Sequence, residues 1–401
     1  MKDSKIKVCI VSVHFFPMKT SCAVLMTDLA KEFSANKHNV TVITPTSNFN
    51  EKSSLTKYDD YQIYRFRSFK ILDISFFKRA LNELFLPITF LFSFFSSQIN
   101  EEKFDYIIWY SPSIFLSPII WLLKRKSKAK TYLILRDIFP EWTLDLGLMN
   151  KGIIYNFFRF IALFQYKIAD IVGIQSESNF EIIKNKVSQQ KVEVLNNWNS
   201  ESETIDIENN IINLEPYINK NIFVYIGNMG IAQDMNFIID LVEKFKSNNP
   251  ESIFLFVGRG NEVINLKRQS KIKKLENLKF FDEIPHSHVQ DMLKKCTVGI
   301  ISLDPRHKSH NIPGKFISYL QSGLPVIARI NAKSDLENLI TKNKVGVVYS
   351  DYNVDEFAKM ITDMITNKTE LNEKSLNARI LYKNQFETKS AYQQLISHIK
   401  I

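Results

Sequence analysis

The chain has 401 residues, which is longer than one ordinary α/β core, so about two domains are expected. Hydrophobic residues make up 45% of the chain, enough for a sizeable core, and this excludes global disorder. The formal net charge of +10 favours anionic partners, whether phosphorylated substrates, anionic lipid or nucleic acid, without choosing among them.

The cysteines and the N-terminus point to a reducing compartment. The three cysteines, Cys9, Cys22 and Cys296, form no CxxC pair, so no disulfide framework is expected. The apolar run at 7–13 lacks a small-residue cleavage site and is typical of a first strand rather than a signal peptide. No stretch reaches the roughly 18–20 apolar residues of a spanning helix. These features predict a cytoplasmic location.

Apolar, β-branched segments alternate with helical patterns in two series along the chain. This alternation predicts two successive doubly wound α/β domains, each with a mostly parallel sheet. Helical patterns are expected at 24–33, 237–245 and 391–399. The expected strands lie at 7–13, 40–44, 61–66, 106–110, 131–135, 171–175 and 192–195, and then at 223–226, 253–257, 277–281, 298–301, 325–328 and 346–348.

A polar, acidic segment at 200–221 separates the two series and predicts the domain linker. The N-terminal domain is therefore expected at 1–200 and the C-terminal domain at 201–382, while the segment 383–401 can pack back on the first domain. Ligands of such sheets bind at the carboxyl ends of the strands. The two domains are accordingly predicted to face a central cleft.

Two motifs of the second series suit an anionic ligand. Gly227-Asn-Met-Gly230 follows a strand and precedes a helix, where glycines let the backbone approach a phosphate, although an ordinary tight turn has the same pattern. The segment Ile312-Pro-Gly-Lys315 opens a helix with a lysine in its first turn, which is unfavourable with the helix dipole unless an anion docks there. The alternative is a solvated surface lysine.

Charged residues also gather after a strand of the first series. Arg136 and Asp137 follow the strand directly, and Glu141 and Trp142 lie in the next loop. Such clusters supply acids, bases or ligands for sugar hydroxyls, and the alternative is a structural Arg–Asp ion pair. His14 occupies the corresponding place after the first strand.

The segment 69–95 carries an apolar stripe at helical spacing, flanked by Lys70, Lys78 and Arg79. It is too short to span a bilayer, and a helix lying in the membrane interface fits this mixture. A buried core helix and a groove for a partner are the alternatives. The stripe consists of Phe77, Leu81, Leu84, Ile88, Leu91 and Phe95.

Neither metal nor nucleic acid is an expected partner. The histidine pairs 286/288 and 307/310 lack the carboxylate or cysteine that would complete a zinc-type set, so no protein-bound metal and no cofactor are predicted. The dispersed positive charge comes without a recognition-helix or RNP-type motif, which argues against nucleic acid.

The motifs, in this order, resemble the group 1 retaining glycosyltransferases of family 4, which have the GT-B fold of two Rossmann-like domains. The resemblance is closest to bacterial O-antigen transferases of the N-acetyl-L-fucosamine type. The motifs that carry it are His14-Phe-Phe-Pro17, Asp137-Ile-Phe-Pro-Glu141, Gly227-Asn-Met-Gly230, Gly258-Arg-Gly260, Ile312-Pro-Gly-Lys315 and Gly323-Leu-Pro-Val-Ile327.

The resemblance implies a nucleotide sugar in the C-terminal domain, an acceptor on the N-terminal domain, and no metal for the diphosphate. The implied catalytic group comprises Arg136, Asp137, Glu141 and Lys315, and His14, Ser21 and Trp142 are expected to face the acceptor or the cleft. The residues expected at the donor are Gly227, Asn228, Gly230, Gly258, Arg259, Pro313, Gly314, Lys315 and Ser318.

The chain departs from the family pattern at several positions. The Glu-x7-Glu carboxylates are replaced by His310 and Ser318, and the diphosphate-gripping Arg and Lys by Asn228 and Gln233. The glycines of the first loop are replaced by the segment 20–22. The family's catalytic roles therefore cannot be transferred directly.

The expected function is transfer of a sugar from a UDP-sugar, such as UDP-N-acetyl-L-fucosamine, to a polyprenyl-diphosphate-linked saccharide in O-antigen or capsule synthesis. The enzyme would be peripheral on the inner face of the cell membrane, held there through residues 70–95. The alternatives are a sugar-nucleotide-binding pseudo-transferase that assists a partner subunit, and a UDP-sugar 2-epimerase.

Overall fold

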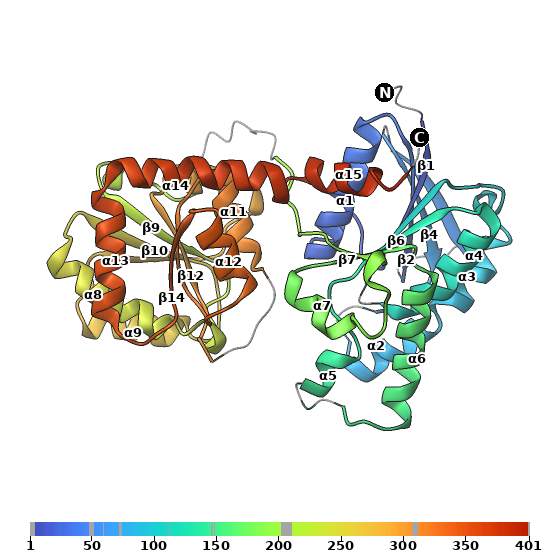
Figure 1. The fold of residues 1–401 in the computed structure, drawn as a ribbon, viewed down its shortest axis with the longest axis horizontal. Coiled ribbons are helices and arrows are strands. Elements are labelled where there is room, and N and C mark those ends of the chain that lie inside the picture. The colour runs from blue at the N-terminus through green and yellow to red at the C-terminus, as the bar shows by residue number, and fades with distance from the viewer. Residues whose placement is uncertain are drawn as a thin grey trace. The chain divides into compact units, whose positions relative to one another are not determined.

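The computed structural model describes residues 5–47, 52–58, 60–71, 74–111, 113–145, 147, 149–201, 211–306 and 312–399. The chain divides into two compact units, each built on its own sheet (Figure 1). The N-terminal unit comprises Met1–Trp198 and Thr388–Ile401, and the C-terminal unit comprises Asn199–Glu387.

The sheet of the N-terminal unit has the strand order β3-β4-β2-β1-β5-β6-β7-β8. Its order reverses direction between β1 and β5, which is the topological switch point of a doubly wound sheet. The edge strand β3 pairs antiparallel with β4, and the other described pairs are parallel. The strands are β1 (Lys7–Val11), β2 (Asn39–Thr46), β3 (Ser53–Lys57), β4 (Gln62–Arg67), β5 (Tyr106–Tyr110), β6 (Lys130–Ile134), β7 (Ile171–Ile174) and β8 (Val192–Val194).

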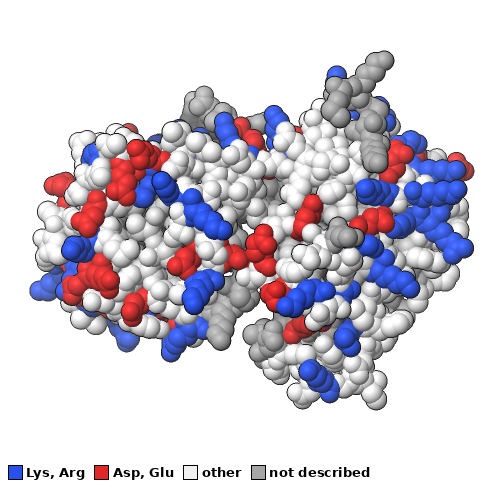
Figure 2. Space-filling model, in the orientation of Figure 1, with Lys and Arg blue, Asp and Glu red and all other residues white. Residues whose placement is uncertain are grey.

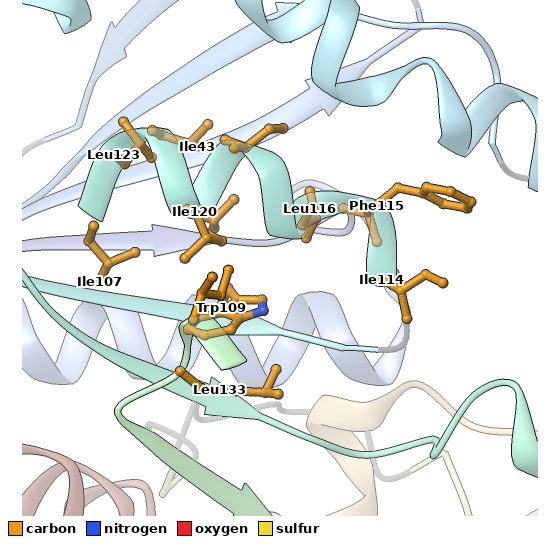
Figure 3. Packing of buried hydrophobic residues seen from close by; sticks show 14 of the residues in the cluster. Ile43, Ile107, Trp109, Ile114, Phe115, Leu116, Ile120, Leu123 and Leu133 are labelled. Carbon is orange, nitrogen blue, oxygen red and sulfur yellow. The ribbon is translucent and has the colours of Figure 1, made fainter. Parts of the chain in front are cut away.

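Helices cover both faces of this sheet, which is why its central strands are apolar on both sides. One core contains residues of α3, α4 and α6, and the other contains residues of α1 and α15 (Figure 1). In the first core, Ile120 of α4 points toward Ile107 and Trp109 of β5 (Figure 3). The helices are α1 (Ser21–Ala35), α2 (Phe76–Leu84), α3 (Leu86–Phe94), α4 (Ser117–Ser127), α5 (Glu141–Asp145), α6 (Ile153–Ile168), α7 (Glu177–Ile183) and α15 (Thr388–Ile396).

The sheet of the C-terminal unit has the order β11-β10-β9-β12-β13-β14, with parallel pairs and a switch point between β9 and β12. Its strands are β9 (Asn221–Ile226), β10 (Ser252–Val257), β11 (Leu278–Phe281), β12 (Val298–Ser302), β13 (Val326–Arg329) and β14 (Gly346–Tyr349). Its helices are α8 (Met235–Asn248), α9 (Val263–Ile272), α10 (His286–Leu293), α11 (Gly314–Ser322), α12 (Asp335–Lys342), α13 (Val354–Thr366) and α14 (Lys368–Leu381).

The prediction of two doubly wound α/β domains is confirmed. The strand that the sequence did not predict is β3, because its five residues are polar or largely exposed at the sheet edge. The return to the N-terminal unit begins at Thr388 rather than at residue 383. Tyr382 and Phe386 are buried in the core of the C-terminal unit, and Tyr382 donates a 2.8 Å hydrogen bond to the carbonyl of Asn199.

The helix α15 completes the N-terminal unit although it is the last helix of the chain. Ala391 and Leu395 are buried in the same core as residues of α1. The hydroxyl of Tyr106 donates to the carbonyl of Leu395 at 3.0 Å. Because these contacts lie within one unit, the polypeptide enters and leaves the C-terminal unit once.

Candidate functional site

The first loop of the C-terminal unit is held by its own hydrogen bonds. The N–H of Gly227 donates to Val257 O at 2.9 Å, and the N–H of Gly230 donates to Gln233 Oε1 at 2.9 Å. The side chain of Asn228 donates to the same Gln233 oxygen at 3.2 Å. Both glycine N–H groups expected at the donor therefore already have partners, one on β10 and one within the loop.

The glycines of the next loop allow two backbones to touch. A Cβ on Gly258 would lie 2.1 Å from Gly227 O, and one on Gly260 would lie 2.1 Å from Met229 O. Both glycines also have positive φ angles, +145° and +155°, which L side chains rarely adopt. The Gly258-Arg-Gly260 motif thus sets the packing of the loop after β10 against the loop after β9. Arg259 points outward, 81% exposed, and pairs with Glu283 at 3.2 Å.

Lys315 is the cation that the structure brings to the first loop. Its Nζ lies 3.5 Å from the centroid of the Tyr225 ring, and a Cβ on Gly227 would be 3.8 Å from Nζ and Cε. Among the described residues, no carboxylate lies within ion-pair distance of this ammonium group. Burial lowers the pKa of Lys315 to about 7, because desolvation disfavours the charged form. A lysine without a counter-ion in this position is suited to accept an anion.

The start of α11 supplies backbone donors beside Lys315. Pro313 is the N-cap residue, without a side-chain cap, and Gly314 is exposed with nothing within 4 Å of a built Cβ. The first N–H groups of a helix have no partner inside the helix and carry its positive dipole end. Ser318 is used differently, since its hydroxyl lies 3.4 Å from the carbonyl of Gly314 in its own helix. Of the expected donor residues, Gly314 leaves open space at the helix start, and beside it Lys315 has a buried ammonium group with no ion-pair partner among the described residues.

A buried arginine that the sequence did not suggest lies at the end of β13. Arg329 is 0% exposed, pairs with Asp234 at 2.6 Å, and packs on the rings of Phe237 and Tyr352. Its Nε and Nη2 atoms have no hydrogen-bond partner in the described residues. The pair anchors the loop before α8, where Asp234 has a φ of +40°. A single arginine at a strand end carries no distinguishing sequence pattern.

In the N-terminal unit, Arg136 is a structural residue. Its buried guanidinium donates to Asn197 Oδ1 at 2.6 Å and to the carbonyls of Leu135, Gly173 and Asn196. These bonds tie together the ends of β6, β7 and β8. The Arg–Asp ion pair that the sequence left as the alternative is absent from the ion pairs of the described residues, and the side chain of Asp137 is exposed.

The remaining predicted residues of the N-terminal unit differ in their surroundings. Glu141, half-buried at the start of α5, forms an ion pair with Lys186. Ser21 is the exposed first residue of α1, and the N-cap bond comes instead from Thr20, whose hydroxyl accepts from the N–H of Ala23 at 3.3 Å. The side chain of Trp142 and residues 307–311, including His310, lie outside the described residues.

His14 lies at the switch point with one ring nitrogen unpaired. Its Nδ1 is 3.2 Å from Thr20 Oγ1, while its buried Nε2 has no partner in the described residues. Burial, and secondly the charge of Arg79, lower the pKa of His14 to about 4, so the ring is neutral at pH 7. Desolvation raises the pKa of Asp137, against the charges of Arg136 and Arg79.

Arg79, which the sequence predicts at the start of the membrane segment, also lies near this group and forms an ion pair in its own helix. Its Nε bonds Glu83 Oε1 at 2.7 Å, and the hydroxyl of Ser113 donates to the other oxygen of the buried Glu83 at 2.7 Å. Its charge acts on both His14 and Asp137. The four-residue spacing of Arg79 and Glu83 on a helix is the signal in the sequence that could have found it.

The apolar stripe of the segment 69–95 is exposed rather than buried. The segment forms two helices, α2 and α3, with Pro87 near the start of the second. The helix α3 packs on the core through other residues, among them Phe90 and Phe94, so the described stripe residues of this helix form its outer side. The exposed fractions are 43% for Leu81, 37% for Leu84, 48% for Ile88, 39% for Leu91 and 65% for Phe95.

None of the helices in the described residues is both long and apolar enough to cross a membrane. Within the same ranges, no group of three or more His, Cys, Asp or Glu side chains is placed to hold a metal ion.

The C-terminal part of the chain is similar to a known protein family. Residues 206–391 match the family described as "Glycosyl transferases group 1". A probable glycosyltransferase of Pseudomonas aeruginosa, WbjE, is 24% identical over 230 residues, which span 56% of this chain and 57% of WbjE. The putative colanic acid biosynthesis glycosyl transferase WcaI of Escherichia coli K12 is 22% identical over 354 residues, 83% of this chain and 85% of WcaI.

Solved structures agree on the fold. The Anabaena protein Alr3699/HepE, crystallised with UDP, superposes with a TM-score of 0.64 at 14% identity, covering 98% of this chain and 99% of HepE. This likeness, the group 1 match and the two doubly wound sheets agree with one another. The chain has the two Rossmann-like domains of the GT-B fold, and its residues 206–391 match the group 1 glycosyl transferases, which supports a glycosyltransferase activity.

Proposed function

We propose that the chain transfers a sugar, with retention of anomeric configuration, from a UDP-sugar to a polyprenyl-diphosphate-linked saccharide in O-antigen or capsule synthesis. UDP-N-acetyl-L-fucosamine is the proposed donor, and family 4 is the proposed class. The relatives WbjE and WcaI, one of them named for colanic acid synthesis, support the pathway. The complexes of HepE with UDP and with UDP-glucose support a uridine nucleotide.

One observation carries the donor site: Lys315 lies on the Tyr225 ring beside Gly227, at the start of α11. Cleavage of the donor builds negative charge on the leaving diphosphate. A lysine ammonium and the N–H groups of a helix start stabilise that charge without a metal ion. Arg259, which is exposed and paired with Glu283, is a weaker candidate for this role.

The acceptor is proposed to bind at the strand ends of the N-terminal unit. Asp137 and the neutral ring of His14 can bond hydroxyl groups there, and Arg79 adds a positive charge that suits a phosphate. The lipid of the acceptor would stay in the bilayer, which the exposed stripe of α2 and α3 contacts together with Lys70 and Lys78. The predicted cleft between the two domains stays a prediction.

The test is transfer with Lys315→Ala, compared with Lys359→Ala, an exposed lysine of α13 in the same unit. Loss of one preorganised charge is expected to lower kcat by roughly 10²–10³-fold. The control variant should act like the wild type. Transfer would be followed from a panel of UDP-sugars to a polyprenyl-diphosphate disaccharide in the presence of EDTA, and NMR would establish the configuration of the new bond.

Each result has a defined meaning. Wild-type turnover by Lys315→Ala contradicts the diphosphate assignment, and loss of all activity in EDTA contradicts metal-independent transfer. UDP binding without transfer to any acceptor would favour a pseudo-transferase that assists a partner subunit. Conversion of the donor alone to its epimer would favour a UDP-sugar 2-epimerase.

A further inference from the structure

The helix α6 has a second apolar side that the described residues of its unit leave exposed. Ile153, Phe157 and Phe160 are 90%, 44% and 72% exposed, and Phe164 continues their row at helical spacing. The opposite side of α6 is buried, with Tyr155, Phe158, Ala162, Gln165, Tyr166 and Ile168. An exposed aromatic row of this size marks a surface that another apolar phase covers.

The row ends in a basic groove between α4 and α6. The groove has a volume of about 550 Å³, and its lining includes Trp121, Phe164 and the cations Lys124, Arg125, Lys128 and Lys167. Lys124 forms an ion pair with Asp170 at 2.8 Å. In the part of the chain that the structure describes, the other three cations have no carboxylate within ion-pair distance. The guanidinium of Arg125 lies 5.5 Å from the centroid of Trp121, whose side of the groove is therefore both aromatic and positive.

Positive charge predominates in the two stretches of sequence that form this surface. The sequence holds no Asp or Glu between Tyr106 and Arg136 or between Leu146 and Ala169, while it holds several Lys and Arg in both stretches. Figure 2 shows Lys and Arg side chains gathered on the side of the N-terminal unit where α4 lies. The positive charge of such a surface attracts an anionic partner. The aromatic row by itself does not select an acidic or a neutral protein as that partner.

The groove between α4 and α6 lies next to the exposed stripe of α2 and α3. The helix α4 contacts both α3 and α6, and all three cover the same face of the sheet (Figure 1). The exposed side chains of α3 and its C-cap include Phe92, at 75%, and Phe95, at 65%. Aromatic side chains and cations therefore extend across three neighbouring helices rather than along the segment 70–95 alone.

We propose that this α4–α6 surface, formed by Trp121, Arg125, Phe157, Phe160, Phe164 and Lys167, docks on an anionic phospholipid bilayer. The aromatic row of α6 inserts among the acyl chains at the interface, and the groove takes the phosphate of a lipid headgroup. This inference deepens the membrane part of the proposed function and rests on it. It places the widest membrane contact on a helix with no acidic residue, outside the segment 70–95.

The experiment is co-sedimentation of the full chain with vesicles of phosphatidylcholine, alone or with part of it replaced by phosphatidylglycerol. Phe157→Ser/Phe160→Ser removes the aromatic row, and Arg125→Gln/Lys167→Gln removes two cations. The matched controls lie on exposed positions of the C-terminal unit: Ile264→Ser/Ile272→Ser and Lys271→Gln/Lys359→Gln. Thermal unfolding checks that every variant is folded.

The wild type and both controls should bind the anionic vesicles. The charge variant should lose roughly tenfold or more in affinity for phosphatidylglycerol vesicles, since each cation near an anionic surface contributes to binding. The aromatic variant should bind weakly to both kinds of vesicle. Wild-type binding by both variants overturns the proposal, and so does a stable dimer whose formation the aromatic variant abolishes in place of vesicle binding.

Turnover separates this inference from the proposed function. With a short-chain, water-soluble prenyl-diphosphate saccharide as acceptor, both α4–α6 variants should transfer at the wild-type rate, whereas Lys315→Ala should not. Normal vesicle binding by a chain that transfers no sugar would contradict the proposed function alone. Normal transfer by a chain that ignores anionic vesicles would contradict the docking surface alone.

Discussion

At the scale of single residues, the environment of a charged group separates ligand-binding positions from structural ones. Arg136 and Lys315 both lie in motifs that the sequence singles out. The guanidinium of Arg136, however, has hydrogen-bond partners at three strand ends. Lys315 has only the face of the Tyr225 ring, and burial lowers its pKa to about 7. Burial raises the free energy of a charged lysine, and a bound anion lowers that free energy most where no other counter-ion is present.

Donor binding should therefore depend on pH. Above about pH 7, Lys315 is neutral in the protein without donor, so binding of a diphosphate must take up a proton. The affinity for the donor should therefore fall by up to about tenfold per pH unit. Titration calorimetry with the best-binding UDP-sugar between pH 6 and pH 9, in buffers of different ionisation enthalpy, measures both effects.

Lys315→Arg is the control for this pH dependence, because its guanidinium stays charged throughout that range. Its affinity should be nearly constant with pH, and its binding should release or take up no proton through this position. A wild-type affinity that does not change with pH would show that Lys315 keeps its charge in the free protein or does not contact the donor.

At the scale of elements, the glycines of the predicted donor motifs have two kinds of surroundings. Two of them permit close packing of two loops, and one lies in open space at the start of a helix. Gly258 and Gly260 let the loop after β10 touch the loop after β9. Gly314, in the first turn of α11, has open space around it. We therefore expect Gly258 and Gly260 to matter for folding, and Gly314 to matter for binding of the donor.

Two substitutions test this division. Gly260→Ala should destabilise the C-terminal unit, because its Cβ would meet Met229 O and its φ is +155°. Gly314→Ala should keep or raise stability, by at most about 1 kcal/mol, since alanine favours a helix. It should nevertheless weaken UDP binding if the diphosphate lies against the first N–H groups of α11. Chemical unfolding and UDP titration of both variants measure these outcomes, and undiminished binding by Gly314→Ala would count against the position of the diphosphate.

At the scale of the whole molecule, the end of the chain stabilises its beginning. Leu395 of α15 is 0% exposed in a core that contains Leu25 and Phe33 of α1. The ring of Phe33 also meets that of Tyr392, with centroids 4.9 Å apart. A substitution in the core of the last helix should therefore lower the stability of the N-terminal unit.

Leu395→Ala should cost the N-terminal unit about 2–5 kcal/mol, the usual cost of emptying a buried leucine site. Hydrogen exchange should show loss of protection in α1 and β1, while α8 and β9 of the C-terminal unit keep theirs. Leu376→Ala, at a 60% exposed position of α14, serves as the control. Equal loss of protection in both units would mean that the two unfold together.

The sequence by itself determined the two doubly wound sheets, because strands buried on both faces must be apolar throughout and loops between them must break that pattern. It also determined the stripe of α2 and α3 and placed Lys315 at the start of a helix. Local spacing is sufficient for these features, since each depends on residues close together in the chain.

Only the tertiary structure decided which charged groups have partners. The bonds of Arg136 reach residues 37 to 61 positions away, and Arg79 acts on His14 and Asp137 from a different helix. The exposure of the aromatic row on α6 likewise depends on which helices lie beside it. Pairing and burial are set by contacts between distant segments, and the pattern along one segment does not contain them.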